Sequence, residues 1–133
     1  MKTLIAFITI ASTVFFVNYK YTKVGDADMI ILVRKIDELQ QRVVELYYDY
    51  MTARDLYNLT TNMVKERENN YKKAQNSQKE VILITDTFYR TALDEQVKAR
   101  GSFYEKRSQL EQLVGNDIFN QFEKNIDERN SKN

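Results

Sequence analysis

The sequence predicts an all-α protein, in which a long antiparallel helical hairpin, similar to a coiled coil, follows an N-terminal hydrophobic helix. Three observations support this fold class. The chain has 133 residues, no proline and three glycines, which favours long uninterrupted helices over a turn-rich β fold. Apolar residues recur at alternating steps of three and four over much of the chain, as in a helix with one apolar seam. An uncharged apolar run lies near the N-terminus.

Residues 1–25 are the first segment, which we interpret as a signal peptide or a signal anchor. One basic residue, Lys2, precedes an uncharged and mainly apolar run over residues 4–17, and further lysines follow it. This order is that of the n- and h-regions of a secretory signal. Residues 3–19 are about 17 residues long, which is the lower limit for crossing a bilayer when flanking lysines extend to its surface.

The fate of this segment stays open between three alternatives. No small-x-small cleavage site follows the run directly. The segment is therefore an uncleaved anchor, a cleaved signal or a hydrophobic terminus that packs on the protein itself. Lys2 on one side and Lys20 with Lys23 on the other do not fix a membrane orientation. We predict a cell-envelope protein, membrane-anchored through residues 3–19 or periplasmic.

Residues 26–133 are the second segment, and its first helix is expected from about residue 31 to residue 75. The apolar positions of its seam are Ile36, Leu39, Val43, Leu46, Tyr50, Ala53, Tyr57 and Val64. The pattern continues to Tyr71 and Ala74 with one missed position, at Arg67. A strand would scatter these residues over both of its faces. A helix of this length is typical of a coiled coil or an elongated bundle.

A short turn is expected to connect this helix to a second one. Asn76, Ser77 and Gln78 are the predicted turn, and the second helix extends from about residue 79 to residue 114. Gly115 directly follows the last periodic residue, which is a common stop signal for a helix. A short amphipathic helix is predicted from about residue 117 to residue 129.

Both long helices carry more apolar residues than one seam needs. In the first helix the additional set is Val44, Tyr47, Leu59 and Met63. In the second helix one side carries Phe88, Ala92, Ala99, Phe103, Leu110 and Leu113, and another side carries Tyr89, Leu93, Val97, Tyr104 and Val114. A free-standing hairpin needs one apolar stripe per helix. The second stripes therefore predict neighbouring helices on both sides, although a simple bundle or a homo-oligomer would satisfy the same pattern.

The composition excludes several classes of chemistry. Cysteine and histidine are absent, so disulfides, Cys/His zinc sites and histidine-based triads are excluded. The adjacent pairs Asp37/Glu38 and Asp94/Glu95 point about 100° apart on a helix and do not converge. Twenty basic residues balance 19 acidic ones, so nothing favours a nucleic acid as partner. We predict a non-catalytic protein with no cofactor, no metal and no small-molecule substrate.

The stretch from Val43 to Phe122 resembles the last periplasmic hairpin of the TolC-type outer-membrane efflux channels. Three pieces carry the likeness. Residues 44–54, VELYYDYMTAR, resemble the ascending helix, residues 86–100, DTFYRTALDEQVKAR, resemble the descending helix, and residues 110–115, LEQLVG, resemble the L-x-x-L-x-G ending. A full family member has two such repeats, each with a β-hairpin. This chain has one helical hairpin, no predicted barrel strands and no glycine in its turn.

The resemblance implies a bacterial envelope protein that belongs to a trimeric export channel with an α-helical tunnel. The hairpin tip would lie at residues 74–86, with Asn76, Ser77, Gln78 and Asp86 as candidate partner contacts. The partners would be TolC-like channel or adaptor subunits, and this chain would be a truncated remnant or an accessory subunit. The alternative is a membrane-anchored homo-oligomeric coiled-coil scaffold or spacer, whose partners are copies of itself.

Overall fold

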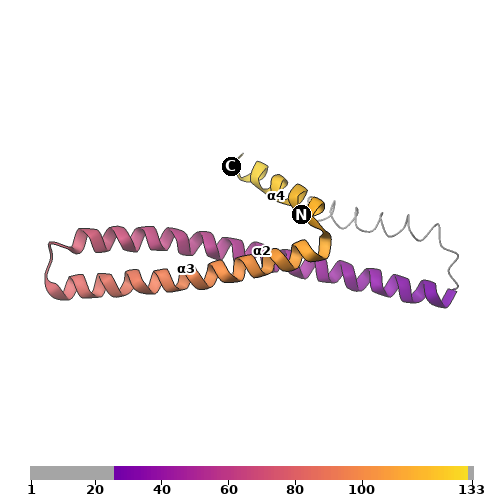
Figure 1. Ribbon diagram of the computed structural model, residues 1–133, viewed down its shortest axis with the longest axis horizontal. Coiled ribbons are helices and arrows are strands. Elements are labelled where there is room, and N and C mark those ends of the chain that lie inside the picture. Colours follow the sequence, from indigo (N-terminus) through magenta and orange to yellow (C-terminus); the bar gives the residue numbers. More distant parts are fainter. Residues whose placement is uncertain (1–25, 132–133) are drawn as a thin grey trace. The chain divides into compact units, whose positions relative to one another are not determined.

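The computed structural model describes residues 26–131, which form three helices and no strand (Figure 1). The helices are α2 (Asp26–Ala74), α3 (Lys79–Val114) and α4 (Asn116–Asn130). The predicted all-α fold with two long packed helices is confirmed for this part of the chain. The predicted hydrophobic helix in residues 1–25 lies outside the described residues.

The chain divides into two compact units, which are described separately. Residues 49–108 form one of them, which we call the hairpin unit. It contains the second half of α2, the turn and most of α3, and the two helices lie side by side (Figure 1). Residues 26–48 and 109–131 belong to the other, which we call the terminal unit.

The turn between α2 and α3 is closed by backbone hydrogen bonds. The N–H of Ser77 donates to the carbonyl of Ala74 at 2.8 Å, which ends α2. The carbonyl of Gln78 accepts from the N–H groups of Val81 and Ile82 at 3.0 and 3.2 Å, which places Gln78 at the start of α3. These bonds satisfy backbone groups that a helix end otherwise leaves open, so the turn needs no glycine.

In the terminal unit, Gly115 separates α3 from α4. Its φ of +86° is the left-handed conformation that favours glycine over residues with a Cβ. Its N–H donates to the carbonyl of Glu111 at 2.8 Å, and its own carbonyl accepts from the N–H of Phe119 at 3.1 Å. One residue therefore ends one helix and begins the next. The buried side chains of this unit are Val43, Leu46, Leu110, Phe119, Phe122 and Ile126.

α2 begins at Asp26, whereas the periodic pattern placed the start of this helix near residue 31. The pattern fails in this stretch because residues 29–33 are five consecutive apolar residues, Met-Ile-Ile-Leu-Val. Such a run contains no helical period. The carboxylate of Asp28, in the first turn, interacts favourably with the positive N-terminal end of the helix dipole.

Candidate interaction surface

The seam residues of α2 lie in both units and differ in burial. In the hairpin unit Tyr50 is 1% exposed and Ala53 is buried, while Tyr57 and Val64 are half-buried. In the terminal unit Val43 and Leu46 are buried, while Ile36 and Leu39 are half-buried. Full burial of a valine, leucine or larger apolar side chain contributes about 1.5–3 kcal/mol to the free energy of folding. The tightest packing is therefore at the centre of the predicted seam.

Aromatic rings of α2 pack against one ring of α3 in the hairpin unit. Phe103 stacks between Tyr50 and Tyr57, and its ring centroid is 5.7 Å from each of theirs. Nearer the turn, Tyr71 of α2 stacks on Tyr89 of α3 at 6.0 Å. Stacked pairs at these distances add about 0.5–1.5 kcal/mol beyond the area that they bury. These contacts fix which parts of the two helices face each other.

Small residues on α3 leave room for the rings of α2. Ala92 and Ala99 are both buried in the hairpin unit. Alternation of small and large side chains across facing positions lets two helices interdigitate at native density. Gly101 has no such function, because a Cβ added there would meet no atom within 4 Å.

Several polar groups in and beside the seam form hydrogen bonds or ion pairs. Thr60, a buried polar residue, donates its hydroxyl to the carbonyl of Leu56 at 3.0 Å. The amide of Gln96 on α3 donates to the hydroxyl of Thr61 on α2 at 3.1 Å. At the other end of the hairpin unit, Lys106 Nζ lies 3.2 Å from Asp49 Oδ2. The Thr60 bond lies within α2, whereas the Gln96–Thr61 bond and the Lys106–Asp49 pair connect the two helices and favour one register between them, since a shift would break both.

The missed position at Arg67 has a structural explanation. The Arg67 guanidinium lies over the ring of Phe88, with its central carbon 5.3 Å from the ring centroid. A cation over a ring face is attracted by the ring's negative π surface. Arg67 therefore packs as a half-buried seam residue with a charged end. Phe88 itself is 51% exposed, so it lies outside the seam, and Tyr89 faces α2 instead.

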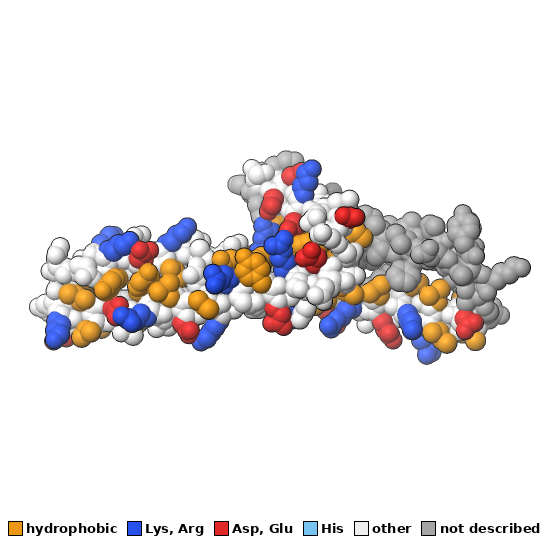
Figure 2. Space-filling view, viewed as in Figure 1, with side chains coloured by type: hydrophobic (Ala, Val, Ile, Leu, Met, Phe, Trp, Pro, Cys, Tyr) orange, Lys and Arg blue, Asp and Glu red, His pale blue; other side chains and the backbone are white. Residues whose placement is uncertain are grey.

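Two sets of exposed apolar residues border the seam of the hairpin unit. The first set, which we call flank 1, is Leu56, Leu59, Val81, Ile84 and Phe88. The second set, flank 2, is Leu83, Val97 and Tyr104. Figure 2 shows hydrophobic side chains exposed along the hairpin among charged ones.

The two flanks lie on opposite sides of the seam. On α3, Val81 and Phe88 directly precede the inward-facing residues Ile82 and Tyr89, whereas Leu83 directly follows Ile82. At 100° per residue, the residues before and after a seam position are separated by about 200°. On α2, the flank 1 residues likewise precede seam positions. Two antiparallel helices that lie side by side are related by a two-fold axis perpendicular to the plane that contains both helix axes. This rotation exchanges the helices but keeps each side of the pair in place. Residues that directly precede seam positions therefore lie on the same side of the pair in both helices.

The predicted tip residues do not converge on one point. Asn76, Ser77 and Gln78 are exposed in the turn. Asp86 is half-buried and lies further along α3, where its Oδ2 accepts from Arg90 Nε at 2.9 Å within the same helix. The tip therefore offers an exposed polar turn and a separate ion pair.

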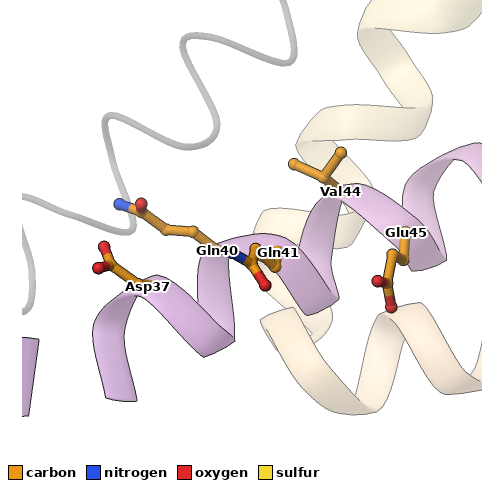
Figure 3. Close-up of a pocket in the computed structure, with 5 residues that line it drawn as sticks. All are labelled: Asp37, Gln40, Gln41, Val44 and Glu45. Carbon is orange, nitrogen blue, oxygen red and sulfur yellow. The ribbon is translucent and has the colours of Figure 1, made fainter. Parts of the chain in front are cut away.

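The terminal unit has an open groove along α2. Among the described residues, Asp37, Gln40, Gln41, Val44 and Glu45 line it (Figure 3). All five come from one helix, and its two carboxylates are eight residues apart, or about 12 Å along the axis. They cannot act on one reacting atom. Within residues 26–131, no group of three acidic side chains is placed to hold a metal ion.

Exposed ion pairs within the helices complete the surface of the hairpin unit. Lys98 Nζ lies 2.6 Å from Asp94 Oδ2, and this hydrogen bond raises the pKa of Lys98 above its ordinary value of 10.5. Lys72 has the same relation to Glu68, whose hydrogen bond raises the pKa of Lys72. Both lysines are fully exposed, so these pairs are solvated helix surface.

Sequence reasoning identified part of flank 1 and most of flank 2. Leu59 and Val97 appear in the predicted second stripes, and the structure leaves each of them 57% exposed. Leu56 and Phe88 were missed as exposed residues. For Leu56 the available signal was its position directly before the seam residue Tyr57, whereas the sequence alone does not separate Phe88 from Tyr89.

None of the helices in residues 26–131 has a stretch both long and apolar enough to cross a membrane. No protein-family model, curated protein or solved structure matches the chain.

Proposed function

We propose that this chain is a non-catalytic structural protein of the bacterial cell envelope that contributes one helical hairpin to an assembly of side-by-side helices. The supporting observation is the pair of flanks. Flank 1 and flank 2 expose large apolar side chains on opposite sides of a hairpin whose own seam is already closed. A hairpin with two uncovered apolar sides is suited to lie between two neighbours.

The arrangement that we favour is that of a TolC-like export channel, whose wall consists of helices packed in this way. The residue patterns at 44–54, 86–100 and 110–115 support this choice, and residues 3–19 would attach the chain to the membrane. With one hairpin, the chain would act as an accessory subunit or a truncated remnant. Transport would be passive, and no bond would be made or broken by the chain.

Site-specific photo-crosslinking in membranes tests this proposal. A photoreactive phenylalanine analogue at Leu59 in flank 1 or Val97 in flank 2 should crosslink to a TolC-like channel or adaptor subunit, identified by mass spectrometry. The control position is Asn62, which is exposed and lies on the side of α2 opposite the seam. Absence of crosslinks at both flank positions would contradict the proposal.

The second candidate is the homo-oligomeric scaffold or spacer. One observation favours it, namely that the seam closes within a single chain through Tyr50, Phe103 and Tyr57. The hairpin then needs only copies of itself to cover its flanks. In the crosslinking experiment, products that contain only this chain would support the scaffold and exclude the channel subunit.

A further inference from the structure

The first turns of α2 carry an apolar segment that differs in kind from the flanks. Residues 29–33, which we call the collar, are Met29, Ile30, Ile31, Leu32 and Val33. Four of them are exposed, with Ile30 at 57% and Ile31 at 55%, and Leu32 is half-buried. Large exposed apolar patches on a protein surface mark sites of interaction.

The apolar residues of the collar are distributed around the whole circumference of α2, whereas each flank occupies one side of the hairpin. Five consecutive residues at 100° each extend through more than one full turn. A neighbouring helix covers only a stripe of such a surface. Lipid covers all sides at once, because it has no fixed shape. The collar pattern therefore fits a bilayer better than it fits a protein partner.

The length of the collar matches the thickness of the polar interfacial region of one leaflet. Five helical residues span about 7.5 Å along the axis. The polar and interfacial region of one leaflet is about 5–8 Å thick. A helix lying flat on a membrane would instead show apolar residues at helical spacing along its length. The collar is therefore suited to enter the interface end-on, and it is far too short to cross the membrane.

The position of the collar in the chain supports the same occupant. Nine residues separate Tyr19, at the end of the apolar run 3–19, from the collar. This connection spans at most about 35 Å, so a membrane-inserted run would keep the collar near the membrane. Residues 20–38 contain four basic and four acidic residues, so their formal net charge is zero. Arg34 and Lys35 directly follow the collar, where they can meet anionic headgroups.

We propose that the collar, residues 29–33, is a membrane-interface segment that enters the headgroup layer of a bilayer. The proposal rests on the membrane attachment through residues 3–19 in the proposed function. It adds that the base of α2 stands in the membrane surface, so that the long helix projects away from it.

Single-cysteine labelling of the full chain tests the proposal, since the sequence has no native cysteine. An environment-sensitive fluorophore is attached at Ile31→Cys in the collar or, as control, at Leu59→Cys, which is equally exposed. Each variant is reconstituted with phosphatidylcholine–phosphatidylglycerol vesicles, and membrane attachment is measured by flotation. Brominated lipids should quench the label at residue 31 several-fold more than the label at residue 59.

Three other outcomes overturn the proposal, and they are distinguishable. If the chain floats but iodide in the water quenches the label at residue 31 freely, the attachment stands and the collar proposal fails. If this label is shielded from iodide and brominated lipids do not quench it, protein covers the collar. If the chain does not float with the vesicles, both the attachment and the collar proposal are wrong.

Discussion

Replacing Tyr50 by aspartate should unfold the hairpin unit, whereas the same charge at Leu59 should leave it folded. Tyr50 is 1% exposed and stacks on Phe103. Removal of a buried aromatic side chain costs about 3–5 kcal/mol, and an uncompensated buried charge costs several kcal/mol more. The sum is comparable to the whole stability of a typical domain, about 5–15 kcal/mol. Leu59 is 57% exposed, so Leu59→Asp brings a charge only to the surface.

The assay is urea unfolding of the full chain, followed by circular dichroism at 222 nm. Tyr50→Asp should lose the cooperative transition, and Leu59→Asp should keep the midpoint of the unmodified chain. Leu59→Asp should instead weaken association, which size-exclusion chromatography measures on the same sample. An unchanged midpoint for Tyr50→Asp would show that the seam assignment is wrong. Unfolding by Leu59→Asp would show that flank 1 belongs to the core.

The remaining predictions concern the glycines and one ion pair. Gly101→Ala should raise the free energy of unfolding by about 0.5–1 kcal/mol, since Gly101 is mid-helix with open space around it; a lower midpoint in urea would contradict this. Gly115→Ala should lower it by about 1–2 kcal/mol, because the φ of +86° strains a residue with a Cβ; an unchanged midpoint would refute the strain. Asp94→Asn should bring the pKa of Lys98 back toward 10.5 in a ¹³C NMR titration. The raised pKa means that this pair stabilises the fold below the ordinary lysine pKa of 10.5 and that its contribution is lost as the pH rises through the folded-state pKa. An unchanged Lys98 pKa in Asp94→Asn would disprove this pairing.

The helical class and the packing of two long helices could be predicted because the apolar period is long and regular. Steps of three and four from Val43 to Ala53 are typical of a helix with one buried face, and the four apolar residues at these steps, Val43, Leu46, Tyr50 and Ala53, are buried. The start of α2 could not be predicted from the period, because the collar residues are all apolar.

The seam of α3 was harder to predict than that of α2. Phe88 and Tyr89 both precede Ala92 by a helical step, of four and three residues respectively. The sequence alone cannot choose between them. The choice depends on α2, where Tyr71 stacks on Tyr89 and Arg67 covers Phe88. Such pairings between segments that are distant in sequence leave no local signal.

The sequence predicted that both long helices carry more apolar residues than one seam needs. It did not predict which of these residues are exposed. The second stripes predict neighbouring helices on both sides of the hairpin, with a simple bundle or a homo-oligomer as the alternative. Which residues are exposed depends on the register between α2 and α3, and polar contacts such as Gln96 to Thr61 contribute to this register.

The most direct test of the central claim is the association state of residues 26–133, measured by sedimentation velocity with circular dichroism on the same sample. The claim is that both flanks of the hairpin must be covered by neighbouring helices. It predicts that the fragment does not persist as a folded monomer. A discrete helical oligomer would identify copies of the chain as the neighbours, and an aggregating or poorly folded fragment would indicate that a different subunit is missing. A stable, highly helical monomer would contradict the claim.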